Sequence, residues 1–358
     1  MGALIIGILV LYFIGNAYIY IKLLHQIATL PLWAKITISV IFWLLSILMF
    51  ISFRARQFNI PAMVSRSIFN LGAIWMLAVL YMVLILGCFD IIKLIFHPVK
   101  YSFYIAMATT VLLMIYGNIN YHHPKVNRLD IKLDKPLTSP IKIAAISDLH
   151  LGEGTGRNQL QRYINLIQSE QPDLIVIAGD LIDNSVRPLY RDSIADLLSQ
   201  LHAPLGIYMV LGNHEYISGV NAARKFLENT PITLLRDSVV TLPNGLQIVG
   251  RDDKTNEGRK WLKELLTQTD STKPVLVLDH QPYELANTDA LGVDIQFSGH
   301  THHGQVWPIS IVTDIKFEQS HGYRKWKNTH IYVSSGLSLW GPAFRIGTNS
   351  DMGVITLR

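Results

Sequence analysis

Four long apolar stretches in the first third of the chain constrain its fold more than any other feature. They cover residues 2–21, 36–53, 68–92 and 101–119, and the only charge within them is Asp90. A helix needs about 20 residues to cross the ~30 Å hydrocarbon core of a bilayer. Helices of soluble proteins keep a polar face, which these stretches lack. We therefore predict a four-helix transmembrane region over residues 1–120, in preference to a buried bundle of a soluble protein.

The charges are few and unevenly placed. Only 16% of the 358 residues are charged, whereas soluble domains carry about 25%. Residues 1–120 have a net charge of +6 and the remainder has −1, so the overall +5 belongs to the apolar third. Basic charge at the ends of membrane spans favours contact with a lipid bilayer. We expect the bilayer as a partner and no nucleic acid.

Basic residues near the spans predict their orientation. Four spans place both chain ends on one side, which holds seven nearby basic residues against four on the other. Lys and Arg are enriched on the cytoplasmic side, so this count predicts a cytoplasmic C-terminal domain. The seven are Arg54, Arg56, Arg66, Lys125, Arg128, Lys132 and Lys135, and the four are Lys22, Lys35, Lys93 and Lys100.

The rest of the chain has the pattern of an α/β domain. A polar, proline-containing stretch at residues 121–140 is expected to be a linker, and the domain is expected over 141–358. Short β-branched runs alternate with amphipathic segments, which favours strands alternating with helices. Expected strands cover 141–147, 173–179, 206–212, 274–279, 293–298 and 331–335. Expected helices cover 158–169, 191–200 and 221–228, and Asn244-Gly245 is a hairpin signal.

Acidic, amide and imidazole side chains follow five of these strands. The strand ends read Asp148-Leu149-His150, Gly179-Asp180-Leu181-Ile182-Asp183, Gly212-Asn213-His214-Glu215, Asp279-His280 and Gly299-His300-Thr301-His302-His303-Gly304. Sites in open α/β sheets form beyond the carboxyl ends of strands, so these side chains should meet. Carboxylate and imidazole groups bind divalent cations such as Mn, Fe or Zn. There are too many candidate ligands for one ion, which favours two ions that share a carboxylate.

A single cysteine, Cys88, excludes an intrachain disulfide and a structural cysteine-zinc site. The glycine-rich run at residues 152–156 lacks the Lys-Ser/Thr of a phosphate-binding loop. No serine nucleophile motif is present in the sequence. Metal chemistry is therefore the chemistry that the sequence favours.

The ordered motifs Asp-x-His, Gly-Asp-x-x-Asp, Gly-Asn-His-Glu, a lone His and Gly-His-x-His resemble those of the calcineurin-like metallophosphoesterases. The likeness covers roughly residues 141–358. The run from Gly299 to Gln305 and the closing stretches 333–337 and 345–347 are similar to the membrane-associated bacterial branch. At His303 that branch would be expected to have Gly. The resemblance implies a two-sheet β-sandwich flanked by helices, and a multi-pass protein of the bacterial inner membrane.

The resemblance also implies roles for individual residues. The first metal would be held by Asp148, His150 and His302. The second would be held by Asn213, His280 and His300, and Asp180 would bridge the two. His214 would lie beside the substrate phosphate, as a transition-state stabiliser or leaving-group acid. The metal identities stay open among Mn, Fe and Zn.

Four further residues keep more than one interpretation. Asp183 and Glu215 are expected to orient the ligands rather than to bind metal. His303 is either an exposed loop residue or a substrate contact. Arg345 either contacts phosphate or forms a structural ion pair.

Together these features predict a membrane-anchored dinuclear-metal phosphoesterase that hydrolyses a phosphodiester or pyrophosphate. A lipid-linked substrate is our hypothesis, since tethering concentrates the site at the bilayer. The alternative is a catalytically silent, metal-stabilised membrane scaffold or regulator.

Overall fold

The computed structural model describes residues 2–55 and 61–358, and the chain divides into two compact units, residues 1–118 and 119–358. Arg56, one of the residues that predict the orientation, lies outside the described part.

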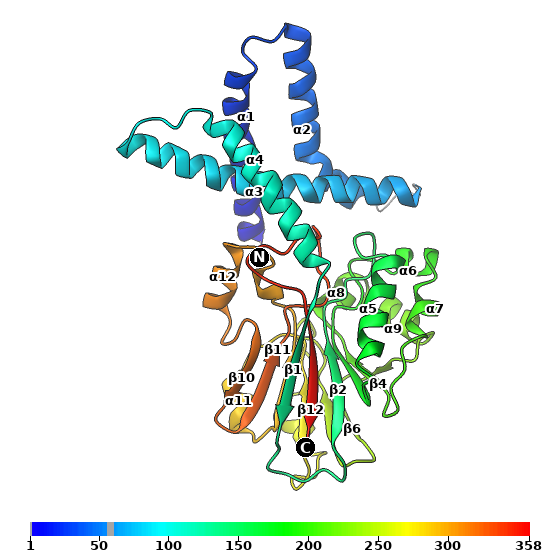
Figure 1. Ribbon diagram of the computed structural model, residues 1–358. Helices are drawn as coiled ribbons and strands as arrows, with labels where there is room; N and C mark the ends of the chain where they lie inside the picture. Colours follow the sequence, from blue (N-terminus) through cyan, green and yellow to red (C-terminus); the bar gives the residue numbers. More distant parts are fainter. Residues whose placement is uncertain (1, 56–60) are drawn as a thin grey trace. The chain divides into compact units, whose positions relative to one another are not determined.

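The first unit contains long apolar helices (Figure 1). They are α1 (Gly2–Gln26), α2 (Leu32–Ala55), α3 (Ala62–Ile95) and α4 (Ser102–Tyr121), of which the last ends in the second unit. Within the described residues, four helical segments have the length and hydropathy that a membrane crossing requires: Ile6–Gln26, Leu32–Ser52, Met63–Ile95 and Ser102–Tyr121. They coincide with the four predicted spans, and the third is longer than expected.

A small core and a few polar contacts connect these helices. Leu86 of α3 is buried in the same cluster as Phe42 of α2 and Ala106 of α4. Asp90, the only acidic residue of this unit, lies 2.5 Å from Nζ of Lys22 and accepts a 2.6 Å hydrogen bond from Tyr18. The carboxylate of Asp90, the one charge inside the third predicted span, is thus paired with Lys22 of the same unit.

The second unit contains two six-stranded sheets. The first has the order β1-β12-β2-β3-β4-β5, in which β2 to β5 run parallel and β12 pairs antiparallel with β2. Its strands are β1 (Lys125–Ile131), β2 (Ile141–Ile146), β3 (Leu174–Ala178), β4 (Ile207–Val210), β5 (Thr233–Leu234) and β12 (Asp351–Leu357).

The second sheet has the order β10-β11-β9-β8-β7-β6, with β11, β9, β8 and β7 parallel and an antiparallel strand at each edge. Its strands are β6 (Ser238–Thr241), β7 (Gln247–Gly250), β8 (Val275–Leu278), β9 (Ile295–Ser298), β10 (Gly322–Trp326) and β11 (Thr329–Val333). The hairpin signal at Asn244-Gly245 lies between β6 and β7.

The strands are apolar on both faces because each face is covered. Along β2, Ile141 and Ile143 pack into the core that contains Ile248 and Phe297 of the second sheet. The alternate residue Ile146 packs into a second core, with Leu160 of α5, among others. Continuous apolar runs are expected for parallel strands buried in this way. The two-sheet sandwich flanked by helices is therefore confirmed.

Short helices lie around the two sheets, and most of them are labelled in Figure 1. They are α5 (Arg157–Ser169), α6 (Arg187–Arg191), α7 (Ile194–Leu198), α8 (Asn213–Ile217), α9 (Val220–Leu227), α10 (Leu262–Leu266), α11 (Leu285–Ala290), α12 (Ile309–Lys316) and the 3-10 turn η1 (His302–Gly304).

Residues 121–140, which we expected to be a linker, include a strand. In β1, Lys125 to Ile131 pair in parallel with Asp351 to Leu357 of β12. Ile131 is buried in the core between the sheets, so this segment is part of the second unit. Because the segment is polar and flanked by prolines, its sequence did not predict this edge strand.

Candidate metal centre

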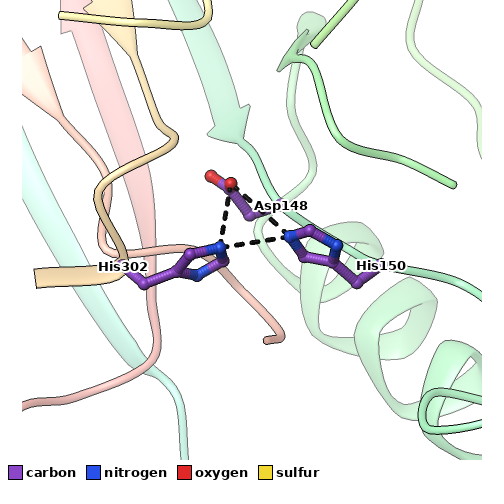
Figure 2. Close-up of side chains that lie close together, drawn as sticks. All are labelled: Asp148, His150 and His302. Atoms are coloured by element: carbon purple, nitrogen blue, oxygen red, sulfur yellow. Dashed lines mark hydrogen bonds and ion pairs between the residues drawn. The ribbon is translucent and has the colours of Figure 1, made fainter. Parts of the chain in front are cut away.

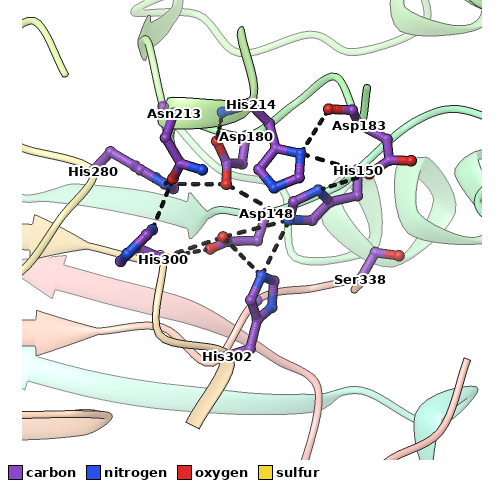
Figure 3. A network of polar contacts seen from close by, with 12 residues as sticks. Asp148, His150, Asp180, Asp183, Asn213, His214, His280, His300, His302 and Ser338 are labelled. Carbon is purple, nitrogen blue, oxygen red and sulfur yellow. Dashed lines mark hydrogen bonds and ion pairs between the residues drawn. The ribbon is translucent and has the colours of Figure 1, made fainter. Parts of the chain in front are cut away.

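The predicted site residues all follow the carboxyl ends of parallel strands. Asp148 and His150 come after β2, Asp180 and Asp183 after β3, and Asn213 and His214 begin α8 after β4. His280 comes after β8, and His300 and His302 after β9. Figure 3 shows these side chains converging on one region. The sandwich therefore brings together residues that are up to 154 positions apart in the chain.

The loops reach this geometry through unusual backbone conformations. Asp148, His150, Asp180, His300 and His302 all have positive φ, between 43° and 72°. Residues other than glycine rarely adopt this region, and such conformations concentrate at functional sites. Close approach adds a second constraint, since a Cβ at position 212 or 299 would collide with a neighbouring carboxylate.

A first cluster consists of Asp148, His150 and His302, all of which are buried (Figure 2). Nε2 of His150 lies 3.1 Å from Nε2 of His302. Oδ1 of Asp148 lies 3.4 Å from Nε2 of His302 and 3.8 Å from Nε2 of His150. Two imidazole nitrogens and a carboxylate oxygen thus face one another.

A second cluster consists of Asp180, His280 and His300, joined by Asn213. Oδ2 of Asp180 lies 3.1 Å from Nε2 of His280. Oδ1 of Asn213 lies 3.2 Å from Nε2 of His280 and 2.8 Å from Nδ1 of His300.

Asp180 connects the two clusters. The same oxygen that faces His280, Oδ2, lies 3.7 Å from Nε2 of His150 in the first cluster. Its other oxygen accepts the backbone N–H of His214 at 2.9 Å. One carboxylate is therefore held between two sets of ligand atoms.

Neighbouring groups fix the direction of the imidazoles. Nδ1 of His280 donates to the carbonyl oxygen of Ala178 at 2.7 Å, which leaves Nε2 toward Asp180. Nδ1 of His150 lies 3.6 Å from Oδ1 of Asp183. Groups behind a histidine that set its tautomer in this way are characteristic of metal sites. Asp183 lies behind this ring, and its expected orienting role stays a prediction.

Glu215 holds the backbone of two loops together. Its fully buried carboxylate accepts N–H groups of Asp180 at 3.0 Å, Ile182 at 2.9 Å and Gly212 at 2.7 Å. Burial, together with the charge of Asp180, raises the pKa of Glu215 to about 7. The side chain thus supports the loops that carry Asp180 and Asn213, as an orienting residue would.

His214 lies at the edge of the clusters. Its side chain is 12% exposed, and its Nδ1 donates to the carbonyl oxygen of Asp183 at 2.6 Å. Its ring makes an edge contact with His150, with centroids 4.5 Å apart. Burial lowers the pKa of His214.

Comparison with known proteins agrees with this geometry. The family model for the calcineurin-like phosphoesterase matches residues 141–304. An uncharacterised metallophosphoesterase of Aquifex aeolicus is 32% identical, over 70% of this chain and 98% of its own. The chain belongs to the calcineurin-like phosphoesterase family.

Two further relatives of this family extend the comparison. An uncharacterised metallophosphoesterase of Campylobacter jejuni is 27% identical, over 98% of this chain and 97% of its own. A protein of Danio rerio named transmembrane protein with metallophosphoesterase domain is 29% identical, over 71% of this chain and 62% of its own. The resemblance found in the sequence is confirmed.

The residues fit the divalent metals that the calcineurin-like phosphoesterase family implies. Buried carboxylates raise the pKa of two imidazoles. Although burial opposes it, contacts with Asp148 and Asp183 raise the pKa of His150 to about 10, and the charge of Asp180 raises the pKa of His280. His300 stays neutral, because burial and the charge of His280 lower its pKa to about 4. Such a set of oxygen and imidazole donors suits Mn, Fe or Zn.

Arg345 makes backbone contacts that neither of its two interpretations included. It is fully buried, and its guanidinium donates to backbone carbonyls of His302 at 2.5 Å and Gly336 at 3.2 Å, and also to those of Ser335 and Ser338. It therefore fastens the segment after β11 to the turn that carries His302. Backbone carbonyls are present in every residue, so the sequence around Arg345 does not show that its guanidinium binds four of them.

The sequence motifs also missed two supporting groups of the calcineurin-like phosphoesterase domain. Asp279, directly before His280, is buried and forms ion pairs with Arg251 at 2.7 Å and Arg259 at 3.2 Å. Ser338 bonds Tyr121 and Thr155, each at 2.8 Å, and its backbone N–H donates to the carbonyl of Asp148. In the sequence, the position of Asp279 directly before His280 was the only sign of a supporting role. Its arginine partners could not be predicted, because they are distant in sequence.

Proposed function

We propose that the protein is a membrane-anchored phosphoesterase with two divalent metals. Asp148, His150 and His302 would hold one ion, and Asn213, His280 and His300 the other. The single observation that carries this proposal is the position of Asp180, whose Oδ2 faces His150 and His280. A carboxylate that faces both sets of ligand atoms would suit two ions.

The chemistry follows from the donor set and its surroundings. Bound ions would neutralise the phosphoryl oxygens and supply an acidic water as the nucleophile. The chain itself orients the reactants. The bond from Nδ1 of His214 to the Asp183 carbonyl leaves Nε2 available for the departing oxygen. An anionic phosphoester beside the ring favours the protonated imidazole, which can then give its proton to the leaving group.

The role of His214 can be tested on the purified full-length protein. A panel of phosphodiesters and pyrophosphates is assayed with Mn²⁺, together with metal analysis of the same preparation. His214→Ala should lower kcat by about 10²–10⁴-fold and leave the metal content unchanged. His202→Ala changes an exposed histidine and is the matched control. Unchanged hydrolysis in His214→Ala would show that the assigned role is wrong.

A catalytically silent scaffold is the competing function. Against it stands the proximity of all seven candidate ligands with His214 beside them. Asp180→Asn separates the two functions, because it removes the shared charge and is close in size. If the wild type shows metal-dependent hydrolysis and Asp180→Asn abolishes it, the protein is an enzyme. If the metal-loaded wild type hydrolyses no phosphoester, the result supports the scaffold.

We further propose a lipid-linked substrate. The four apolar helices and the transmembrane relatives favour a site that works at a bilayer. Within the second unit, α12 follows directly after the turn that carries His302, and it exposes apolar side chains. Val312 is 60% exposed and Ile315 is 81% exposed, with Trp307 nearby in sequence at 51%. An exposed apolar helix face is suited to acyl chains or the lipid interface.

A direct rate comparison tests this substrate class. Wild-type protein in mixed micelles should hydrolyse a lipid phosphoester faster than a water-soluble ester with the same leaving group. Val312→Ser with Ile315→Ser should lower only the lipid rate, whereas Thr313→Ser on the same helix should lower neither. Equal rates for the two esters in the wild type would count against a lipid-linked substrate but not against the phosphoesterase.

The location we propose is the bacterial inner membrane, with the phosphoesterase domain in the cytoplasm. The distribution of basic residues at the span ends supports it. A reporter that is active only in the cytoplasm, fused after Arg358, should be active, and a periplasmic reporter at the same position should be silent.

A further inference from the structure

We propose that His303, Asp314 and His321 form a third cation site, separate from the dinuclear centre. The three residues come from different parts of the second unit: the turn η1, the helix α12 and the segment before β10. None of these side chains belongs to the two clusters that contain Asp180 or Asp148. The site goes beyond the proposed function, because no step of the hydrolysis requires it.

The distances between the ligand atoms fit one ion. Oδ1 of Asp314 lies 3.6 Å from Nε2 of His303 and 3.9 Å from Nδ1 of His321. All three ligand atoms lie within 4.8 Å of one another. A tetrahedral zinc site with bonds of 2.0–2.2 Å separates its ligand atoms by roughly 3.4 Å. The two measured edges would have to contract by less than 1 Å to reach that separation.

The side chains have the freedom to make that adjustment. The two imidazoles are stacked, with centroids 3.4 Å apart and an interplanar angle of 15°, so they must turn for their nitrogens to converge. His321 and Asp314 are half exposed, at 46% and 50%, which permits rotation and gives an ion access from solvent. Ser320 contacts the Asp314 carboxylate and lies 3.0 Å from Nδ1 of His321, so it keeps the two near each other.

The backbone at His303 gives an independent reason to look for a role of this side chain. Its φ is 48°, in the left-handed region that glycine adopts most readily. Glycine is also the residue expected here from the resemblance to the bacterial branch. A histidine in this conformation places an imidazole beside Asp314 and His321, which no glycine could do.

The donor set indicates the class of ion. Two imidazoles and one carboxylate, with water completing the coordination, suit Zn²⁺ or a similar transition-metal ion and not Mg²⁺ or Ca²⁺. Bound there, the ion would fasten α12 to the turn that follows His302. The site would therefore steady the segment that carries a proposed ligand of the dinuclear centre.

The number of ions bound per chain tests whether this third site exists. Full-length protein in detergent is stripped with a chelator, titrated with Zn²⁺, passed through a desalting column and analysed for metal. We expect three ions per chain in the wild type and two in His321→Ala. His303→Gly should also bind two, and it keeps the backbone conformation because glycine tolerates the positive φ. His202→Ala should bind three.

Two controls keep the result unambiguous. Asp314→Asn is a nearly isosteric second variant and should also bind two ions, so the outcome does not depend on the histidine variants folding. Asp180→Asn should lower the number of ions at the dinuclear centre and retain the one that His321→Ala removes. A third ion held no more tightly by the wild type than by His321→Ala would overturn the proposal, and so would a total metal content that His321→Ala and Asp314→Asn leave unchanged.

Discussion

Glu215 illustrates how much of the site depends on single side chains that contact no proposed ion. Its carboxylate accepts three backbone N–H groups from the loops after β3 and β4. An amide has only one acceptor oxygen, so Glu215→Gln must leave at least one of these buried donors without its partner. A buried unsatisfied group costs about 1–3 kcal/mol.

We therefore expect Glu215→Gln to lower the free energy of unfolding by about 1–3 kcal/mol at pH 8. It should also weaken metal binding, because Asp180 and Asn213 lie on the loosened loops. Denaturant unfolding and metal titration measure the two effects. Glu264→Gln is the matched control, since that exposed carboxylate accepts a single N–H, from Trp261 at 3.0 Å. Equal losses in both variants would refute the role of Glu215.

The protonation of His150 and His280 predicts how metal binding depends on pH. Nearby carboxylates outweigh burial and raise the pKa of His150 to about 10 and that of His280 in the same direction. In metal-stripped protein at pH 7 we therefore expect protons to compete with the ions for both imidazoles. Raising the pH removes this competition, so affinity should rise by up to about 100-fold per pH unit above pH 7.

Calorimetric titration of stripped protein in buffers with different ionisation enthalpies measures those protons. Close to two should be released at pH 7 when the dinuclear centre fills. His202→Ala should release the same number, and Asp180→Asn fewer, because it removes the charge that raises the pKa of His280. An affinity independent of pH between 7 and 9 would contradict the prediction.

At the scale of elements, the sequence predicted the strands that carry the site because their chemistry is local. An apolar run such as 174–178 followed by Gly-Asp shows both the strand and the ligand at its end. The edge strands were less visible. In β1 the polar and apolar residues do not alternate strictly, since Asn127 and Arg128 are adjacent, and only the pairing with β12 identifies the segment as a strand. The backbone contacts of Arg345 were not predicted, because its partners are carbonyl oxygens that any sequence supplies.

A substitution of Arg345 tests how the segment after β11 is attached to the turn that carries His302. Its guanidinium reaches carbonyls on two segments, that of His302 and those at 335–338, whereas an ammonium is too compact to span both sets. We expect Arg345→Lys to destabilise the second unit by about 1–3 kcal/mol. Affinity for the ion that His302 is proposed to hold should fall with it.

Thermal unfolding and metal titration of Arg345→Lys measure both effects. Arg324→Lys changes an exposed arginine of β10 and is the control. Loss of stability without any change in metal affinity would show that the segment after β11 does not position His302.

At the scale of the whole molecule, the two units should respond differently to metal removal. The first unit has its own core around Leu86, and the proposed ligands all belong to the second unit. An ion present at a hundredfold excess over its dissociation constant stabilises the folded state by about 2.7 kcal/mol. For a domain of this size that corresponds to roughly 5–10 °C in Tm for each ion.

Chelation should therefore lower the Tm of the second unit by at least that amount and leave the first unit unchanged. Single-tryptophan variants report on each unit separately: Trp75 alone for the first and Trp326 alone for the second. The unfolding transition seen by Trp326 should move when EDTA is added and return with Mn²⁺, whereas the transition seen by Trp75 should not move. In an Asp180→Asn background most of the shift at Trp326 should vanish, because the shared ligand is gone. A shift of equal size at both tryptophans would mean that the ions stabilise the protein through something other than the proposed centre.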